Sequence, residues 1–451
     1  MSKIMTTNKG LTRRNAHLYV LGCKVNQAEI DSVSTFLEQC GFEIDHDCES
    51  PDLVFINTCC VTDSAAGKSR RLIKRLSEKY AESKMVVSGC LAEIDPAMIT
   101  KVSANALVLG THAKDHFPEI LSRDIYDVSS VNSNPASSCS QFSSAWRTTR
   151  SSRSRAFLKV QDGCSHRCSY CVVPIARGPS RSMELNEAVR SAQILNEGGY
   201  SEIAVTGIHL GAYGRDLSPR IKLEDLVTRL LSDVPSCRFR LSSIEPQDFS
   251  EELLSLISHT SRICRHFHIP TQSGDDKTLK NMFRPYKTDL VLRLTAKIFE
   301  SVPDACVGMD IMVGFPGETD ESFKKTEEFI KKSRCNYLHV FPFSPRKGTV
   351  AQGLPNRVPK QIARSRVRIL RNLSTELRST FFSKFVDRKL EALIESIETN
   401  PAGRGKGLTD NYIPIHIRGL ENGVIRKIVP VKVDKVTQRE VLGTTCDKDR
   451  N

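Results

Sequence analysis

The sequence has no apolar run of the length that a membrane-spanning helix needs. Its longest apolar stretches, such as Ala16 to Gly22 and Leu53 to Ile56, are strand-sized, whereas a span takes roughly 20 apolar residues. The first fifteen residues carry four basic side chains, but no apolar core of a secretory signal follows them. We therefore predict a cytoplasmic protein that makes no membrane contact.

Disulfide bonds are a poor explanation for the fifteen cysteines of this 451-residue chain, because the cytosol is reducing. Clustered cysteines are then better interpreted as metal ligands or redox groups, and scattered ones as buried thiols. The formal charge of +13 favours a polyanionic partner, which makes nucleic acid a candidate. The length alone suggests about three domains.

Strand-like and helix-like runs alternate in the first part of the chain. The strand-like runs are His17–Gly22, Asp52–Thr58 and Met85–Gly89, and the helix-like runs are Asn26–Cys40 and Thr62–Ala81. This βαβαβ order predicts a parallel sheet with crossover helices, which we place in a domain of residues 15–128. Residues 129–155 are mainly Ser, Asn and Arg, and this composition is typical of a linker.

The middle of the chain continues the alternation over residues 156–380. Six candidate strands are separated by helical runs: Ala156–Val160, Glu202–Thr206, Arg238–Ser242, His266–Ile269, Gly308–Val313 and Tyr337–Phe341. Six such units predict an α/β fold of the partial (β/α)6 barrel type, with its site at the carboxyl ends of the strands. A basic helical run, Arg357 to Lys389, follows, and residues 384–446 are predicted to form a small β-barrel.

Three cysteines, Cys164, Cys168 and Cys171, lie close together just after the first strand of the barrel. Three thiolates can hold three irons of a [4Fe-4S] cluster, which leaves the fourth iron open to a substrate or cofactor. Zinc is the alternative, but it normally needs a fourth ligand at a matching spacing, and only His166 is nearby. Three unconnected core thiols are a further alternative.

A second cysteine trio is spread over the first domain. Cys23, Cys59 and Cys90 each follow directly after a predicted strand, so a parallel sheet brings all three to one edge, where α/β sheets bind ligands. The trio is therefore a candidate for a second cluster. Each cysteine could instead be a small buried hydrophobe, and Cys60 is a rival ligand to Cys59.

The Cys-x3-Cys-x2-Cys run, with Tyr170 before its last cysteine, resembles the signature of radical S-adenosylmethionine enzymes. In that family the open iron chelates the amino and carboxylate groups of S-adenosylmethionine, and electron transfer yields a 5′-deoxyadenosyl radical. The segments LGCKVNQAE, INTCCVT and VSGC add a resemblance to the methylthiotransferase family over nearly the whole chain. That resemblance implies an auxiliary [4Fe-4S] cluster on Cys23, Cys59 and Cys90, a radical-enzyme barrel, and a C-terminal RNA-binding β-barrel called TRAM.

Further segments at the strand ends resemble the family's S-adenosylmethionine contacts: VTGIHLGAYG, LSSIEP, HIPTQSGDDKTLKNMFRPY and MDIMVGFPGET. The resemblance implies backbone contacts from two glycines and polar contacts from three side chains. These residues are Gly207, Gly314, Ser243, Glu245 and Gln272. A glycine after a strand can equally be a turn, and Glu245 before a proline can be a solvated loop residue.

The family's substrates are an aspartate of a ribosomal protein and two adenosines beside the tRNA anticodon, one isopentenylated and one threonylcarbamoylated. GCKVNQAE around Lys24 resembles the threonylcarbamoyladenosine branch, which implies 2-methylthiolation of that nucleoside at tRNA position 37 by a monomer that uses two S-adenosylmethionine molecules. No pattern identifies the electron donor or the sulfur source. The isopentenyladenosine and aspartate substrates, or a non-catalytic RNA-binding metalloprotein, are alternatives.

Basic helices and the C-terminal domain supply candidate RNA contacts. They include Lys68, Arg70, Arg71, Lys74 and Arg75 in one helix and Arg364, Arg366, Arg368, Arg371 and Arg378 in another. Such side chains neutralise phosphates and position an RNA, although a solvated cationic face looks the same in sequence. Tyr412 is a candidate for base stacking or for a core aromatic.

Overall fold

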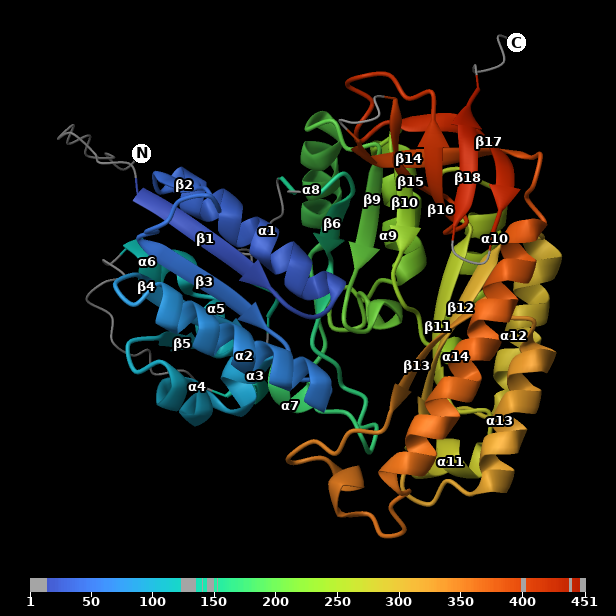
Figure 1. Cartoon of the computed structure of the whole chain (residues 1–451), viewed down its shortest axis with the longest axis horizontal. Helices are drawn as coiled ribbons and strands as arrows, with labels where there is room; N and C mark the ends of the chain where they lie inside the picture. Colours follow the sequence, from blue (N-terminus) through green and yellow to red (C-terminus); the bar gives the residue numbers. More distant parts are fainter. Residues whose placement is uncertain are drawn as a thin grey trace.

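The computed structural model describes residues 14–122, 135–139, 141–143, 150–151, 153–398, 403–437 and 440–446. Three bodies follow one another along the chain: an N-terminal α/β layer structure, a central partial barrel and a small C-terminal barrel that caps one end of the central one (Figure 1). Within the described residues, no helix combines the length and the apolar character that crossing a membrane requires. About half of the expected linker lies outside the described residues.

The N-terminal body is a five-stranded parallel sheet in the order β2-β1-β3-β4-β5. Its strands are β1 (Arg14–Val20), β2 (Phe42–Ile44), β3 (Leu53–Thr58), β4 (Lys84–Gly89) and β5 (Leu107–Leu109). The three strands expected from sequence are confirmed, and the two short edge strands β2 and β5 are additions. All six residues of β3 are buried, as in a central parallel strand covered on both faces.

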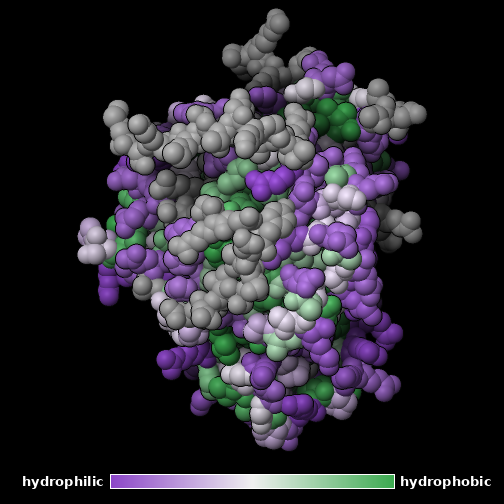
Figure 2. Space-filling model, turned by 90° about the vertical axis from the view of Figure 1, so that its left-hand side faces the viewer, coloured by the Kyte–Doolittle hydropathy of each residue, from purple (hydrophilic) through white to green (hydrophobic). Residues whose placement is uncertain are grey.

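Helices cover both faces of this sheet. They are α1 (Lys24–Gln39), α2 (Asp63–Lys79), α3 (Cys90–Ile94), α4 (Pro96–Val102), α5 (Thr111–Lys114) and α6 (Phe117–Ser122). Side chains of α1 and α6 pack into the core on one face, and those of α2 and α4 into the core on the other. Seen from this end, the surface is mostly hydrophilic with small apolar areas between (Figure 2).

The central body consists of two three-stranded parallel sheets, in the orders β10-β9-β6 and β11-β12-β13, joined by a single bridge between Phe239 and Ile263. The strands are β6 (Ala156–Lys159), β9 (Glu202–Thr206), β10 (Arg238–Leu241), β11 (His266–Gln272), β12 (Cys306–Val313) and β13 (Tyr337–Pro342). All six expected strands are confirmed. The sheet is open between β6 and β13, so it forms a partial barrel.

Helices pack outside these strands, and a short antiparallel pair lies near the start of the barrel. The helices are α7 (Val173–Arg177), α8 (Leu185–Glu197), α9 (Leu223–Asp233), α10 (Glu251–Ser258), α11 (Asp276–Asn281), α12 (Thr288–Ser301) and α13 (Asp320–Ser333); the pair is β7 (Gln161–Asp162) and β8 (Arg181–Ser182). The long basic helix α14 (Lys360–Ser383) runs beside β13 and leads into the last domain (Figure 1).

The C-terminal body is a closed barrel in the order β14-β15-β16-β18-β17. It comprises β14 (Lys389–Ile397), β15 (Arg404–Thr409), β16 (Pro414–Arg418), β17 (Ile428–Val436) and β18 (Val441–Thr445). The expected small β-barrel is therefore confirmed. Tyr412 does not extend freely from it, because its ring stacks on His266 of β11 with centroids 3.9 Å apart.

The two basic helices differ in how their cations are used. The five named cations of α2 are all exposed, as expected. On α14, Arg364, Arg368 and Arg371 are exposed, but Arg366 is buried and pairs with Glu318 and Asp320. The expectation of a continuous cationic face is therefore wrong at Arg366, whose charge is neutralised inside the protein.

Candidate active site

The loop of the first cysteine trio opens into a cavity of about 480 Å³ at the carboxyl ends of the barrel strands. Cys164, Cys168 and Cys171 are all half-buried and all line this cavity. The structure thus brings together the three thiols that the spacing pointed to. Their number, their common cavity and their position at the strand ends fit a cluster with one open iron.

Backbone contacts hold this loop in an irregular conformation. Gly163 has a φ of +67°, and a Cβ there would lie 1.9 Å from the carbonyl oxygen of Pro179, so only glycine fits at this point. The Ser169 amide donates to the carbonyl of Met282 (3.1 Å), and the Ser169 hydroxyl donates to the carbonyl of Asn281 (2.8 Å). The loop is therefore fastened to the end of α11.

Three of the five expected cofactor contacts line the same cavity: Ser243, Glu245 and Gln272. The Oε1 atom of Gln272 is buried and has no hydrogen-bond partner, which is costly unless a ligand supplies one. An unsatisfied acceptor in a cavity beside three thiols fits a bound cofactor with donor groups. This agrees with an S-adenosylmethionine site.

The two glycines expected to contact the cofactor do not line the cavity. A Cβ at Gly207 would lie 2.8 Å from the Oε1 atom of Gln161, and one at Gly314 would lie 2.8 Å from the Cβ of Ala363. Gly314 also has a φ of +75°, and its amide donates to Glu318 Oε1 at 3.0 Å. Both glycines have evident packing roles at strand ends.

Arg284 was not identified from sequence, although it lies inside the quoted segment that contains Gln272. It pairs with Glu245, and its Nη1 donates to the Cys168 sulfur at 3.2 Å. Burial raises the pKa of Cys168, and the neighbouring guanidinium opposes that rise. Arg284 is thus placed to stabilise negative charge on a cluster thiolate.

His209 is a second residue that sequence reasoning missed, because a single histidine after a strand carries no motif. Its Nε2 lies 2.6 Å from Asp248 Oδ2, and its Nδ1 lies 3.8 Å from the Cys164 sulfur. Burial alone would lower the pKa of His209, but Asp248 and Cys164 raise it to about 9. A protonated imidazole therefore faces the first thiol of the loop.

The second cysteine trio converges at the sheet edge, as expected. Cys23 follows β1, Cys59 follows β3 and Cys90 begins α3 after β4. Gly22 is packed so closely that a Cβ on it would lie 3.1 Å from the Cys59 sulfur. Cys59 and Cys90 are buried, and Cys23 is exposed. Burial, and then the charges of Cys90 and Cys23, raise the pKa of Cys59 to about 12.

Cys60, the rival ligand, packs into the apolar core of the α2 face together with Cys90. In neither trio do all three sulfurs lie within 4.8 Å of one another. Thiolates on one zinc ion, at roughly 2.3 Å from the metal, would lie roughly 3.8 Å apart. As the described side chains stand, neither trio is therefore closed up around a single zinc ion.

A buried ionic network connects the two regions that carry the cysteine trios. Arg177, directly after the cysteine loop, donates to Glu29 Oε1 (2.9 Å) and Asp162 Oδ1 (2.8 Å) and also bonds Asn26. Glu29 also accepts from Lys114 and from Lys159, each at 2.8 Å. Asn26 and Glu29 belong to the LGCKVNQAE segment, so part of that motif fixes the N-terminal body against the barrel.

The loop after Cys59 and Cys60 forms part of the wall of the barrel cavity. Val61 and Thr62 line that cavity, and Arg346 of the barrel pairs with Asp63. Arg346 also donates to the carbonyl of Cys60 at 3.0 Å. The chain segment that carries one cysteine of the second trio therefore borders the space into which the first trio opens.

A partial barrel with a three-cysteine loop at its strand ends is the arrangement of one large enzyme class, and residues 158–330 match the family described as the Radical SAM superfamily. Residues 15–110 match the Uncharacterized protein family UPF0004. Among solved structures, the radical S-adenosylmethionine methyltransferase TsrM from Kitasatospora setae has a TM-score of 0.54 at 15% identity, covering 73% of this chain and 72% of that one. This likeness concerns the fold alone.

Curated relatives resemble the chain over almost its full length. The threonylcarbamoyladenosine tRNA methylthiotransferase MtaB of Bacillus subtilis is 34% identical, over 92% of this chain and 93% of that protein. The tRNA-2-methylthio-N(6)-dimethylallyladenosine synthase of Clostridium tetani is 30% identical, over 92% of each. The chain therefore belongs to the methylthiotransferase family of radical S-adenosylmethionine enzymes, and the higher identity is to the MtaB branch.

Proposed function

We propose that this enzyme attaches a methylthio group to C2 of N6-threonylcarbamoyladenosine at position 37 of tRNA. The observation that carries the proposal is the shared cavity wall: the loop after Cys59 borders the cavity of Cys164, Cys168 and Cys171. Sulfur transfer and radical formation must act on one carbon atom, so the two sites have to face a common space. The name of the MtaB relatives supports the choice of nucleoside.

Each trio would hold a [4Fe-4S] cluster, and the trio at Cys164 would bind S-adenosylmethionine. A reduced cluster there supplies the electron that splits the cofactor and so provides the radical that activates the substrate carbon. Burial raises the pKa of Cys171 to about 12, so this thiol loses its proton only when a metal takes its place. Ser243, Glu245, Gln272 and Arg284 would orient the cofactor within the cavity.

Lys24 supports the threonylcarbamoyl substrate over an uncharged one. It is half-buried next to Cys23 and makes no hydrogen bond or ion pair with any described residue. Burial, and then the charges of Arg155 and Arg240, lower the pKa of Lys24 to about 8. The nearby carboxylate of Glu202 is already paired with Arg155 and Arg240, so the Lys24 ammonium is left for an anionic ligand. The threonyl group carries a carboxylate, whereas a dimethylallyl group carries no charge.

The remaining surface fits an RNA substrate. The exposed cations of α2 and α14 would neutralise backbone phosphates, and the C-terminal barrel, proposed as a TRAM domain of residues 384–446, would add shape recognition. The target base must leave its stack to reach the cavity. Tyr412 is not assigned to stacking on RNA, because its ring already stacks on His266.

Nucleoside analysis of tRNA tests the proposal directly. Cells that lack this gene should lose 2-methylthio-N6-threonylcarbamoyladenosine, and the full chain should restore it, whereas Cys164→Ala should not. Loss of the methylthiolated dimethylallyl nucleoside instead would assign the chain to the other tRNA substrate. An unchanged nucleoside profile, with a methylthiolated aspartate missing from a ribosomal protein, would refute the tRNA assignment altogether.

A further inference from the structure

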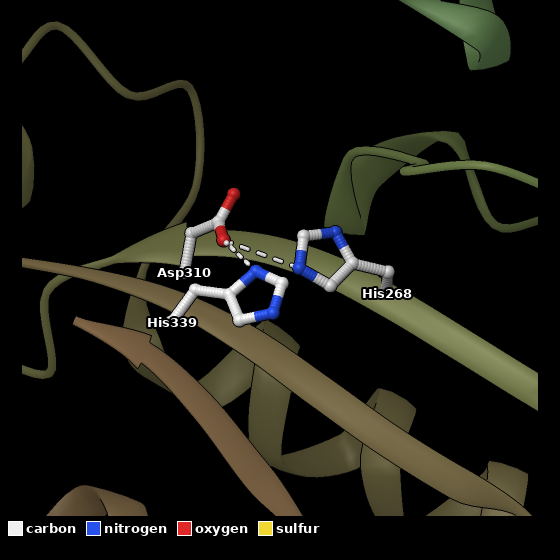
Figure 3. Close-up of side chains that lie close together, drawn as sticks. All are labelled: His268, Asp310 and His339. Atoms are coloured by element: carbon white, nitrogen blue, oxygen red, sulfur yellow. Dashed lines mark ion pairs between the residues drawn. The ribbon is translucent and has the colours of Figure 1, made fainter. Parts of the chain in front are cut away.

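Three neighbouring parallel strands of the barrel each contribute one polar side chain to a common point. His268 lies on β11, Asp310 on β12 and His339 on β13. Asp310 is directly in register with His339, and His268 is in register with Gly308, two residues before Asp310. Residues two apart share a face of a strand. All three side chains therefore lie on one face, and Figure 3 shows both imidazoles approaching the same carboxylate oxygen.

The three ligand atoms are spaced as they would be around one metal ion. Nε2 of His268 lies 3.1 Å from Oδ1 of Asp310, and Nδ1 of His339 lies 3.3 Å from the same oxygen. All three atoms lie within 4.8 Å of one another. Metal–ligand bonds of roughly 2.0–2.2 Å place neighbouring ligand atoms roughly 2.8–3.6 Å apart, from octahedral to tetrahedral angles, so a single ion fits between them.

The approach of His268 to Asp310 is an ion pair that lacks the geometry of a hydrogen bond. Nε2 of His268 is buried and has no hydrogen-bond partner, although Asp310 Oδ1 is 3.1 Å away. At that distance a missing hydrogen bond means that the ring nitrogen is not directed at the oxygen. Ligand atoms around a metal have this relation, because each is directed at the ion and not at its neighbours.

The charge and the surroundings also suit a cation. Among the described residues no lysine or arginine pairs with Asp310, whose side chain is 23% exposed, so its charge is met only by the two imidazoles. The other ring nitrogen of His268, Nδ1, lies 2.7 Å from the Ser243 hydroxyl. Metal-bound histidines almost always make such a second bond, which fixes the tautomer and the ring orientation.

We propose that His268, Asp310 and His339 bind one divalent transition-metal ion, at a site separate from both cysteine trios. Two imidazoles and one carboxylate suit Zn²⁺, Fe²⁺ or Mn²⁺ and supply no soft thiolate. The site lies between two cavities, since Asp310 lines the cavity of the Cys164 trio and His339 lines a second one of about 300 Å³ beside the C-terminal barrel. Three protein ligands leave coordination positions open to these cavities.

Manganese is the probe for this site, because it prefers hard oxygen ligands to soft thiolates and so leaves the cluster thiolates alone. Mn²⁺ is titrated into the full chain with its clusters reconstituted and oxidised, and free Mn²⁺ is measured by its electron paramagnetic resonance signal. The wild type should bind one Mn²⁺ per chain. His339→Ala and Asp310→Asn should each weaken this binding at least about tenfold, while His259→Ala, which removes an exposed histidine elsewhere, should leave it unchanged.

Iron content per chain shows whether each variant is folded and loaded. His339 has a side chain that is 56% exposed, so its removal should not disturb the fold. If Asp310→Asn loses its iron, His339→Ala alone tests whether these residues bind Mn²⁺. Absence of saturable Mn²⁺ binding, or wild-type binding by His339→Ala, would overturn the proposal. Metal binding is measured without turnover, so the result is independent of the proposed tRNA activity.

Discussion

The two cysteine trios are assembled by opposite routes. Cys164, Cys168 and Cys171 lie within one loop, whereas Cys23, Cys59 and Cys90 come from the ends of three parallel strands. A local loop can hold its ligands in place through a few backbone bonds, such as those of Ser169. A site assembled from three strands needs the whole sheet to be folded first, so its integrity depends on the packing of the N-terminal body.

Removing one ligand from each trio should separate the two roles. Cys164→Ala should abolish 5′-deoxyadenosine formation, because the open iron is lost with its cluster. Cys59→Ala should keep that cleavage but lose the methylthiolated nucleoside. Each variant should drop from about eight irons per chain to about four. The measurements are iron content and product analysis of the reduced, reconstituted chain.

Cys60→Ala is the matched control for Cys59→Ala, because the two residues are neighbours in the chain and equally buried. If Cys59 is the ligand, replacement of Cys60 should leave iron content and product unchanged. If Cys60→Ala loses iron and Cys59→Ala does not, the assignment of the auxiliary ligand is wrong. If Cys59→Ala also loses cleavage, the two sites are not functionally separate.

Glu29→Gln should damage both sites together, since Glu29 connects them through Arg177. The change would leave Lys114, Lys159 and Arg177 short of one buried carboxylate. Removing one partner of a buried ion pair costs about 3–5 kcal/mol, so the urea midpoint of the chain should fall and iron at both trios should decrease. Glu38→Gln, at the exposed end of the same helix, should cost under about 1 kcal/mol. Equal midpoints for the two variants would contradict this account.

How well each feature could be predicted from the sequence depends on how far apart its residues lie along the chain. The loop trio has a fixed spacing, and the strand-end trio could be found because each cysteine follows an apolar run. The cationic partners of Glu29 are 85 to 148 positions away, and no local pattern indicates such contacts. The edge strands β2 and β5 are only three residues long, too short for periodicity. Arg366 lies three residues after Ala363 and four before Leu370, on the buried face of α14, and this helical spacing is a signal that sequence reasoning missed.

Gln272→Leu should affect only the proposed S-adenosylmethionine site at the Cys164 trio. If the unsatisfied Oε1 of Gln272 accepts a hydrogen bond from S-adenosylmethionine, its loss should raise the KM for the cofactor about tenfold. Iron content should not change, because Gln272 is not among the cluster ligands. Gln193→Leu, on helix α8, is the matched control. An unaltered KM would remove Gln272 from the cofactor site.

The smallest effect is expected at Lys24, which lies next to Cys23 of the second trio. With a pKa of about 8, its ammonium is mostly charged at pH 7 and mostly neutral at pH 9, so attraction to the threonyl carboxylate should weaken as the pH rises. An ion pair of about 1 kcal/mol corresponds to about a fivefold rise in the KM for tRNA. Lys24→Arg should keep the low KM across this range, because arginine stays charged.

Lys24→Gln should have the raised KM already at pH 7, and both variants should cleave S-adenosylmethionine normally. A wild-type KM that does not change between pH 7 and 9, together with an unaffected Lys24→Gln, would mean that the carboxylate is recognised elsewhere.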